Sequence, residues 1–360
     1  MRAVIVSDGK KGHLNQSLAL AELLGVGHPR VLTARPLRGL LEPLARLLSG
    51  VLSPRHYPTA WRRRVLRSCF GEEENLPASL QAEEAGVLVI SAGTTAAVPA
   101  LALAGGIHAR TLHILRPSLV PARSFDALIL PLHDVGGKLP RNVLTLPVAL
   151  GPVAGEALEQ SRAELCRRLG VAHLPVERFL ALLLGGNSAH YAMEPEPIIH
   201  TVRQTVDFAR GKGLRLLLTT SRRTPGSIEQ ALQALALAEA DVCYCCVWGR
   251  SDAYNPVPAF LHLAGAVLVT EDSVSMASEA VLSGHQPLVH PLRPHGISRK
   301  LGRFHSYLYE RGLAAPLRVE APVAEEWERA LAQPRRTRDE VHAALGLPEL
   351  IERVRELVGL

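Results

Sequence analysis

Short apolar runs alternate with longer stretches of helical spacing through most of this 360-residue chain. Residues 3–7 form an apolar run, residues 8–13 a polar segment with glycines, and residues 14–24 carry leucines and alanines at helical spacing. The pattern continues with strand-like runs at residues 87–91, 111–115, 127–130 and 143–146. Strands that alternate with helices are typical of a parallel, doubly wound sheet.

The same alternation restarts near residue 179. Strand-like runs are found at residues 179–184, 214–218, 242–247, 266–269 and 287–290. Helical patterns lie between them at residues 198–210, 227–240, 258–263 and 273–282. The sequence therefore predicts an α/β fold of two Rossmann-like domains with parallel sheets and an interdomain cleft, where ligands of such folds commonly bind.

A length of 360 residues also fits two domains better than one. We expect a Rossmann-like domain at residues 1–151, a helical connector at 152–172, a second Rossmann-like domain at 173–335 and a C-terminal helix at 336–360. Hydrophobic residues make up 47% of the chain, which is enough to bury a sizeable core in each domain.

The chain has a formal net charge of +6, which favours anionic ligands. Phosphorylated small molecules, an anionic membrane surface and nucleic acid would each fit this charge. Basic and aromatic residues are not interleaved as they are in nucleic-acid modules, so we expect no nucleic-acid partner.

Three of the five cysteines, Cys243, Cys245 and Cys246, lie in one apolar run. Alternate strand residues face opposite sides, so these thiols cannot all bind one metal, and core thiols in a reducing compartment are the better interpretation. The strand-like run at the start of the sequence leads us to expect no signal peptide, and no apolar run reaches the ~18 residues of a membrane span. We expect a cytoplasmic protein, at most peripheral to the inner face of a membrane.

Residues 36–70 depart from the alternation. Leucines at helical spacing precede Trp61, Arg62, Arg63 and Arg64. This combination is typical of a helix that lies on an anionic membrane surface. An ordinary domain helix with a solvated basic face gives the same pattern, and both interpretations stay open.

The segment 270–279 joins a predicted strand to a predicted helix and is rich in hydroxyl and carboxylate groups: Asp272, Ser273, Ser275, Ser278 and Glu279. Unpaired N–H groups and the helix dipole at such a junction attract phosphate. Glu279, further into the helix, is placed to accept hydrogen bonds from ribose hydroxyls. The alternative is a helix cap, in which Asp272 or Ser273 satisfies the first turn.

Two further loops follow strands of the same predicted sheet. Ser221, Arg222 and Arg223 suit a diphosphate, because guanidinium groups bind phosphate oxygens in bidentate fashion; the alternative is a polar surface turn. Gly186 and Asn187 belong to a glycine loop that would let the backbone approach a ligand closely. The three loops leave parallel strands, so we expect them to converge on one edge of the sheet.

In the first domain, the loop that carries Asp8 and His13 is neither a dinucleotide fingerprint nor a P-loop. His13 at a helix start is a candidate general base, with Asp8 as its rival and a structural histidine as the alternative. His133 and Asp134 follow a later strand, but a lone pair of this kind is a poor metal signal, so we expect no metal site.

Several motifs resemble the mitochondrial-fission (elongated mitochondria) family. They are Asp8-Gly9-Lys10, Gly12-His13, Asn15-Gln16, Asn142-Val143-Leu144, Thr219 through Pro225, Asn255-Pro256, Thr270, Asp272 through Met276, Ser278-Glu279-Ala280 and Arg303-Phe304-His305. The family resembles glycosyltransferases of the GT-B fold. Its plant members are linked to recruiting a dynamin-related protein to mitochondria, and bacterial members have been labelled nucleoside-diphosphate-sugar epimerases.

The resemblance implies the GT-B fold more directly than a reaction. With the phosphate-binding groups Arg222, Arg223 and the helix start at Ser273 and Ser275, we expect a metal-independent glycosyltransferase whose substrate is a nucleoside-diphosphate sugar and which needs no cofactor. Gly12-His13 before a helix is also similar to the first loop of the N-acetylglucosaminyltransferase that completes the peptidoglycan lipid precursor, which suggests a lipid-linked or envelope acceptor. The alternatives are a nucleotide-sugar epimerase and a non-catalytic peripheral membrane scaffold. Gly93-Thr94-Thr95 and Leu115 through Ser118 depart from the family pattern, so the acceptor side of the first domain differs.

Overall fold

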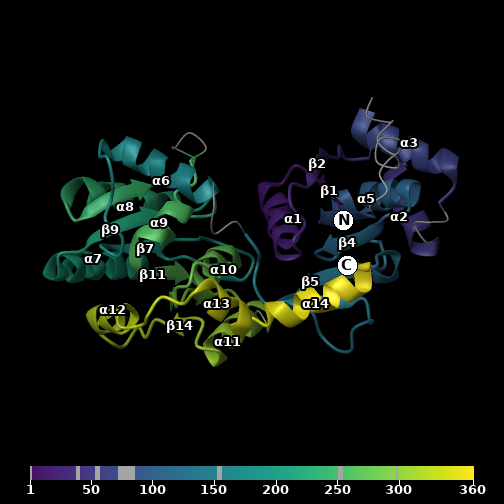
Figure 1. Ribbon diagram of the computed structural model, residues 1–360. Coiled ribbons are helices and arrows are strands. Elements are labelled where there is room, and N and C mark those ends of the chain that lie inside the picture. Colours follow the sequence, from purple (N-terminus) through teal and green to yellow (C-terminus); the bar gives the residue numbers. More distant parts are fainter. Residues whose placement is uncertain are drawn as a thin grey trace. The chain divides into compact units, whose positions relative to one another are not determined.

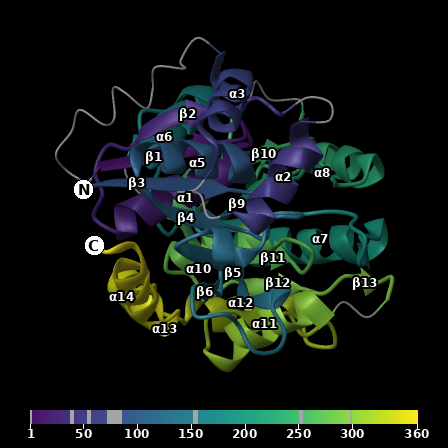
Figure 2. The same cartoon turned by 90° about the vertical axis from the view of Figure 1, so that its right-hand side faces the viewer.

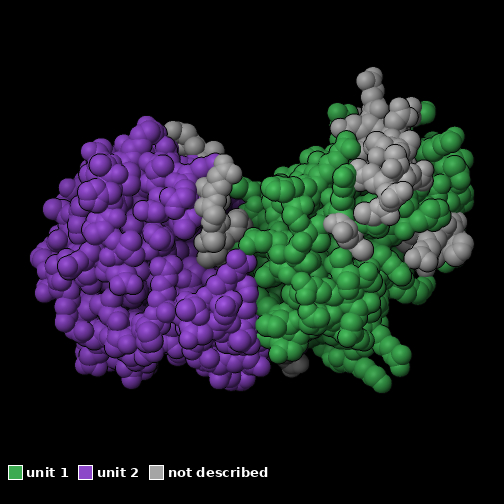
Figure 3. Space-filling model, in the orientation of Figure 1, with its two compact units in different colours: residues 1–152, 346–360 green, residues 153–345 purple. Residues whose placement is uncertain are grey.

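A computed structural model describes residues 2–37, 41–52, 57–71, 86–151, 156–249, 254–296 and 299–360. The chain divides into two compact units (Figure 3). Unit 1 comprises Met1–Pro152 and Gly346–Leu360, and unit 2 comprises Val153–Leu345. Each unit is built around a six-stranded parallel sheet, which confirms the predicted α/β class with two parallel sheets.

The sheet of unit 1 has the strand order β2-β1-β3-β4-β5-β6. Its strands are β1 (Arg2–Ser7), β2 (Arg30–Thr33), β3 (Val87–Ala92), β4 (Arg110–Ile114), β5 (Ala127–Pro131) and β6 (Val143–Leu146). All six residues of β3 are buried, because helices cover both faces of the central strands. Burial on both faces explains why these strands read as continuous apolar runs rather than as alternating ones.

Unit 1 contains the helices α1 (Lys11–Leu23), α2 (Leu41–Val51), α3 (Thr59–Phe70), α5 (Thr94–Ile107) and α14 (Leu347–Val358), with short 3-10 turns η3 (Ala122–Ser124) and η4 (Leu132–Asp134) (Figures 1 and 2). Helix α5 shares a core with Val4, Val6 and Val89. Helix α14 packs on β4, β5 and β6, so the end of the chain belongs to unit 1. The predicted C-terminal helix is two helices, and only the second returns to this sheet.

The sheet of unit 2 has the order β10-β9-β7-β11-β12-β14, all parallel. Its strands are β7 (Phe179–Leu183), β9 (Arg215–Thr219), β10 (Val242–Cys246), β11 (Ala264–Thr270), β12 (Leu288–His290) and β14 (Ala315–Pro316). A separate antiparallel ribbon pairs β8 (Tyr191–Ala192) with β13 (Arg293–Pro294).

The helices of unit 2 are α6 (Glu156–Leu169), α7 (Pro195–Lys212), α8 (Gly226–Ala238), α9 (Val257–Leu263), α10 (Val274–Leu282), α11 (Arg299–Glu310), α12 (Val323–Leu331) and α13 (Arg338–Ala344). Helix α6 occupies much of the predicted connector, yet it packs on α9 and belongs to unit 2. Trp327 of α12 is fully buried and donates a hydrogen bond to Thr205 Oγ1 of α7 at 2.9 Å. No helix in the described ranges is long and apolar enough to cross a membrane.

The strand orders place one topological switch point in each sheet. In unit 1, the chain moves from β1 outward to β2 and then restarts at β3 on the other side of β1. In unit 2, it moves from β7 to β9 and β10 and then restarts at β11 on the other side of β7. Ligands of open α/β sheets bind outside the carboxyl ends of the two strands where the order reverses. The loops after β1 and β3, and after β7 and β11, are therefore the places to look for sites.

The basic, leucine-rich region 36–70, for which an interfacial helix and an ordinary domain helix were both open, contains two helices, α2 and α3, while residues 38–40 and 53–56 lie outside the described residues. Val65, Leu66 and Cys69 of α3 are buried against the core under α5, so α3 is a domain helix. Helix α2 differs, because Leu44 and Leu47 are 51% and 66% exposed.

Candidate functional site

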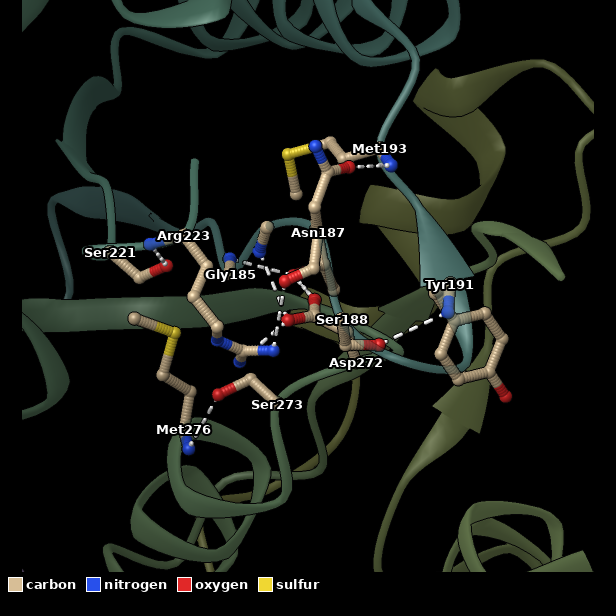
Figure 4. A network of polar contacts seen from close by, with 12 residues as sticks. Gly185, Asn187, Ser188, Tyr191, Met193, Ser221, Arg223, Asp272, Ser273 and Met276 are labelled. Carbon is tan, nitrogen blue, oxygen red and sulfur yellow. Dashed lines mark hydrogen bonds and ion pairs between the residues drawn. The ribbon is translucent and has the colours of Figure 1, made fainter. Parts of the chain in front are cut away.

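Asp272 joins the loops after β7, β9 and β11 at the switch point of unit 2 (Figure 4). Its side chain is completely buried. Asp272 Oδ2 accepts a hydrogen bond from the Gly186 N–H at 2.9 Å and pairs with Arg223 Nη2 at 2.8 Å. Asp272 Oδ1 accepts from the Thr270 hydroxyl at 2.7 Å. The three predicted loops therefore converge, and a buried carboxylate holds them together.

Burial raises the pKa of Asp272, and the hydrogen bonds from Gly186 and Thr270 and the charge of Arg223 act in the opposite direction. Arg223 is thus the counter-ion of a buried acid. Asp272 is not the cap of α10, because Ser273 is the N-cap residue and its Oγ accepts from the Met276 N–H at 3.3 Å. Asp272 therefore holds the loops of the site in place, and its side chain is too buried to contact a ligand.

The two glycines after β7 are required by neighbouring loops. A Cβ on Gly185 would lie 2.3 Å from Asp272 Oδ1, and a Cβ on Gly186 would lie 2.1 Å from the Arg223 carbonyl group. We expected these glycines to let a ligand approach; in the structure, the positions that their Cβ atoms would occupy are taken by Asp272 and by the backbone of Arg223. Asn187 adds two hydrogen bonds to this contact between the loops after β7 and β9. Its N–H donates to the Arg223 carbonyl oxygen at 2.9 Å, and its Oδ1 accepts from the Met193 N–H at 2.8 Å.

The two adjacent arginines after β9 have different environments. The Arg223 N–H donates to Ser221 Oγ at 3.2 Å, and the Arg223 guanidinium group is held by Asp272. Arg222 is exposed and makes no hydrogen bond or ion pair with the residues that the structure describes. Arg222 is therefore the guanidinium group at this edge that is free to bind an anion.

Helix α10 presents one polar face beside these loops. Ser275 is exposed, and Glu279 lies one turn later on the same side, half-buried. The Glu279 carboxyl group has no hydrogen-bond or ion-pair partner among the described residues, and burial raises its pKa to about 7. Ser278 points the other way and is completely buried, so its hydroxyl is shielded from any ligand at this edge.

The switch point of unit 1 holds a histidine–aspartate pair. His13 Nδ1 lies 3.0 Å from Asp8 Oδ2, and the Asp8 side chain is 1% exposed. A carboxylate can only accept, so the neutral imidazole carries its proton on Nδ1 and keeps Nε2 as its basic nitrogen. Lys10 Nζ lies 3.5 Å from the same Asp8 oxygen. Asp8 is therefore a partner that orients His13 rather than a competing exposed base.

Gly93, directly after β3, completes this arrangement. A Cβ there would lie 2.5 Å from His13 Cε1, and Gly93 has a φ of +78°, which favours glycine. A second histidine, His113, hydrogen-bonds Ser91 Oγ at 2.7 Å and is completely buried. Burial, with a smaller effect of His13, lowers the pKa of His113 to about 3, so His113 is neutral and structural.

His133 and Asp134 lie in η4 after β5, which is not one of the two strands, β1 and β3, that flank the switch point of unit 1. Within the described ranges, no group of three or more His, Cys, Asp and Glu side chains is arranged to hold a metal ion.

The family model "Mitochondrial fission ELM1" matches residues 11–345. The chain belongs to this family. A bacterial relative, the uncharacterized protein RP120 of Rickettsia prowazekii, is 25% identical over an alignment of 358 residues, covering 91% of this chain and 93% of the relative. The family match spans the loops of both switch points except the first residues of the β1 loop.

Several solved structures are similar in fold. A UDP-glucosyltransferase from Polygonum tinctorium gives a TM-score of 0.45 at 13% identity, covering 100% of this chain and 99% of that chain. The ADP-heptose heptosyltransferase II of E. coli gives 0.43 at 11% identity, covering 99% and 98%. The UDP-GlcNAc 2-epimerase of Methanocaldococcus jannaschii gives 0.48 at 11% identity, covering 97% and 100%.

Four residues of the two sites were missing from the predicted set: Gly185, Thr224, Thr270 and Gly93. Thr270 ends β11, and its Oγ1 accepts from the Gly185 N–H at 2.7 Å. The Thr224 hydroxyl donates to the Gly185 carbonyl oxygen. Gly93 follows β3 directly. Thr270 and Gly93 could have been found from their positions, because each lies at the carboxyl end of a strand beside a switch point.

Proposed function

We propose that unit 2 binds a nucleoside-diphosphate sugar and that His13 of unit 1 activates the hydroxyl group to which the sugar is transferred. The observation that supports this most strongly is topological. The candidate donor residues and the candidate base belong to two different sheets, and each set lies at the switch point of its own sheet.

The proposed donor site uses side chains that have no partner among the described residues. Arg222 would bind the diphosphate, together with the N–H groups at the start of α10 that Ser273 does not cap. Ser275 would add a hydroxyl donor, and Glu279 would accept from the ribose. These fixed positive groups would stabilise the leaving diphosphate in place of a metal ion.

The proposed base uses the Asp8–His13 hydrogen bond. Transfer to a hydroxyl group needs a base within hydrogen-bond reach of that proton. Asp8 would fix the imidazole ring and stabilise the imidazolium that forms when His13 Nε2 takes the proton.

Calorimetry with nucleoside diphosphates tests the donor site. Arg222→Ala should weaken binding by ~1.5–3 kcal/mol, because a charged hydrogen bond is lost. Arg203→Ala, which removes another exposed arginine of unit 2 on α7, is the matched control and should bind normally. Unchanged affinity in a folded Arg222→Ala protein would remove Arg222 from the proposed site.

Two alternatives share the fold. An epimerase would convert the nucleotide sugar without an acceptor, whereas a transferase releases nucleoside diphosphate only when an acceptor or water takes the sugar. Product analysis with and without an acceptor distinguishes the two. A scaffold that has lost its ligands would bind no nucleotide at all.

We also propose that unit 1 attaches peripherally to anionic membranes through α2. Leu44, Leu47 and Val51 are exposed at spacings of three and four residues, and Arg63 and Arg64 are exposed on α3. Each arginine near anionic lipid contributes ~1 kcal/mol. Co-sedimentation with anionic liposomes should fall with added salt and in Leu47→Ser, and equal sedimentation with neutral liposomes would contradict the proposal. A lipid-linked acceptor would fit such attachment.

A further inference from the structure

Two of the chain's five lysines, Lys10 and Lys11, are adjacent at the start of helix α1. The amino end of a helix carries a partial positive charge, so a lysine there is unfavourable unless an acidic group compensates it. The first turn of α1 contains no acidic residue. Lys10 is compensated by the loop before the helix, because Lys10 Nζ lies 3.5 Å from Asp8 Oδ2. Lys11 is exposed and has no ion-pair partner among the described residues, so water screens its charge.

Lys10 contacts both carboxylate oxygens of Asp8. The Lys10 N–H donates to Asp8 Oδ1 at 3.1 Å, and the Lys10 ammonium group shares Asp8 Oδ2 with His13 Nδ1, at 3.5 and 3.0 Å. The Asp8 side chain is 1% exposed. A carboxylate removed from water needs a positive partner, and a neutral imidazole ring supplies a hydrogen bond but no charge. Lys10 therefore provides the positive charge beside Asp8 while His13 is unprotonated.

We propose that Lys10 keeps His13 unprotonated by neutralising Asp8, an inference that rests on the proposed role of His13 as the base. Without Lys10, protonation of the imidazole ring would give the buried carboxylate its positive partner, and an imidazolium cannot accept a proton from a hydroxyl group. With Lys10 in place, an imidazolium would put a second positive charge beside the same oxygen. Lys10 thus acts on the reaction through Asp8 and His13, and its role requires no contact with a substrate.

The other elements packed around His13 do not offset this effect of Lys10. Gly93, after β3, has no side chain, although a Cβ there would lie 2.5 Å from His13 Cε1. On β4, burial lowers the pKa of His113 to about 3, so this nearby histidine is neutral. The amino end of α1 disfavours an imidazolium, as Lys10 does. Among the described residues, Asp8 is therefore the charged group that favours protonation of His13.

Nuclear magnetic resonance of the full chain, labelled with carbon-13 in its histidines, measures the protonation of His13 directly. The His13 signal is identified by its loss in His13→Gln. In Lys10→Met, half-protonation of His13 should occur about 0.3–0.7 pH unit higher than in wild type, as expected for the loss of one partly screened charge. Lys10→Arg keeps the charge and should titrate like wild type. Lys11→Met removes the neighbouring exposed lysine and is the matched control, with a shift below about 0.2 pH unit.

Asp8→Asn tests the route of the effect. If Lys10 acts through Asp8, then Lys10→Met should shift the titration of His13 less than half as much in Asp8→Asn as in the wild-type background. An equal shift in both backgrounds would overturn the role of Asp8 in the inference. Coincident titrations of wild type and Lys10→Met would overturn the inference as a whole and leave the proposed function standing.

Turnover gives a second readout. In a transfer assay, Lys10→Met should lose about two- to fivefold below the pH of half-protonation and recover at alkaline pH, because the lost fraction is the protonated base. A loss of equal size at every pH would show that Lys10 only supports the fold or binds a substrate, which contradicts the inference. Near-normal turnover of His13→Ala would instead contradict the proposed base, whatever the titrations show.

Discussion

The two switch points are built differently. In unit 2, the buried Asp272 holds three loops together, while Arg222 and Glu279 have no partner among the residues that the structure describes. In unit 1, the buried Asp8 binds the imidazole of His13, leaving one basic nitrogen for a substrate. The first arrangement is a rigid frame that suits an extended, charged ligand. The second positions a single base, so substitutions in unit 2 should alter stability and binding, and those in unit 1 should alter turnover.

The largest expected effect is a loss of turnover when His13 of unit 1 is replaced. His13→Ala should reduce turnover by roughly 10²–10⁴ with unchanged nucleotide affinity, because the positioned base is lost. Asp8→Asn should reduce turnover as well, since an amide no longer selects the imidazole tautomer with its proton on Nδ1. The measurement is release of nucleoside diphosphate in a transfer assay, beside calorimetry on the same proteins. Near-normal turnover of His13→Ala would make the histidine structural.

The next effect tests the frame in unit 2. Asp272→Ala should lower the free energy of unfolding by about 2–4 kcal/mol, because it leaves the buried Gly186 N–H without an acceptor and Arg223 without its counter-ion. Asp272→Asn keeps the shape and an acceptor oxygen, and should lose less. Calorimetric unfolding should show the change in the transition of unit 2, with that of unit 1 unmoved. An unaltered transition would mean that the loops hold together without the carboxylate.

A pair of glycine substitutions compares the two regions directly. Gly186→Ala places a Cβ against the Arg223 backbone and should destabilise unit 2 by about 1–3 kcal/mol. Gly93→Ala should cost about as much in unit 1, since its φ of +78° is strained for alanine. Only Gly93→Ala displaces His13, so it should reduce turnover more than its loss of stability explains. Equal turnover per folded molecule in Gly93→Ala and Gly186→Ala would show that displacing His13 does not affect turnover.

The sequence was sufficient to predict the parallel sheets, because buried strands such as β3 and β7 are continuous apolar runs between polar loops. It did not reveal β2, the short strand β14 (Ala315–Pro316) or the ribbon of β8 and β13. Only one residue of β2 is buried, and the ribbon strands are two residues long. Periodicity shows that a helix has an apolar face but not which sheet covers it, so the return of α14 to unit 1 was not predictable.

For the candidate sites, the sequence likewise predicted the general arrangement but not the individual contacts. The convergence of the three loops followed from their positions after parallel strands. The contacts inside the network did not, because the pairing of Arg223 with Asp272 depends on loop conformations that the sequence pattern does not specify. The burial of Ser278 could have been predicted from the sequence, because the apolar residues Val274, Val281 and Leu282 lie three or four positions away on the same side of α10.

The smallest expected effect is a pH dependence at Glu279. Burial raises the pKa of this carboxyl group to about 7 from a usual value of 4.5, so the folded protein keeps it neutral in a range where the unfolded chain ionises it. The unfolded state then binds fewer protons, and the Glu279 contribution to stability falls as pH rises from about 4.5 to about 7. A ribose hydroxyl donates more strongly to a carboxylate than to a carboxylic acid, so nucleotide affinity should rise about fivefold between pH 6 and 8.

Glu279→Gln is the matched control for this pH dependence. Terminal phosphate groups also titrate near pH 6, and a variant that keeps the ligand and the size of the side chain separates their effect from that of Glu279. Calorimetry across pH 6–8 should give a steeper rise in affinity for wild type than for Glu279→Gln. Parallel curves would show that the carboxyl group does not touch the ribose. The raised pKa would then reflect only the burial of an acid that has no partner among the described residues, and the nucleotide would be held by Arg222 and the neighbouring loops.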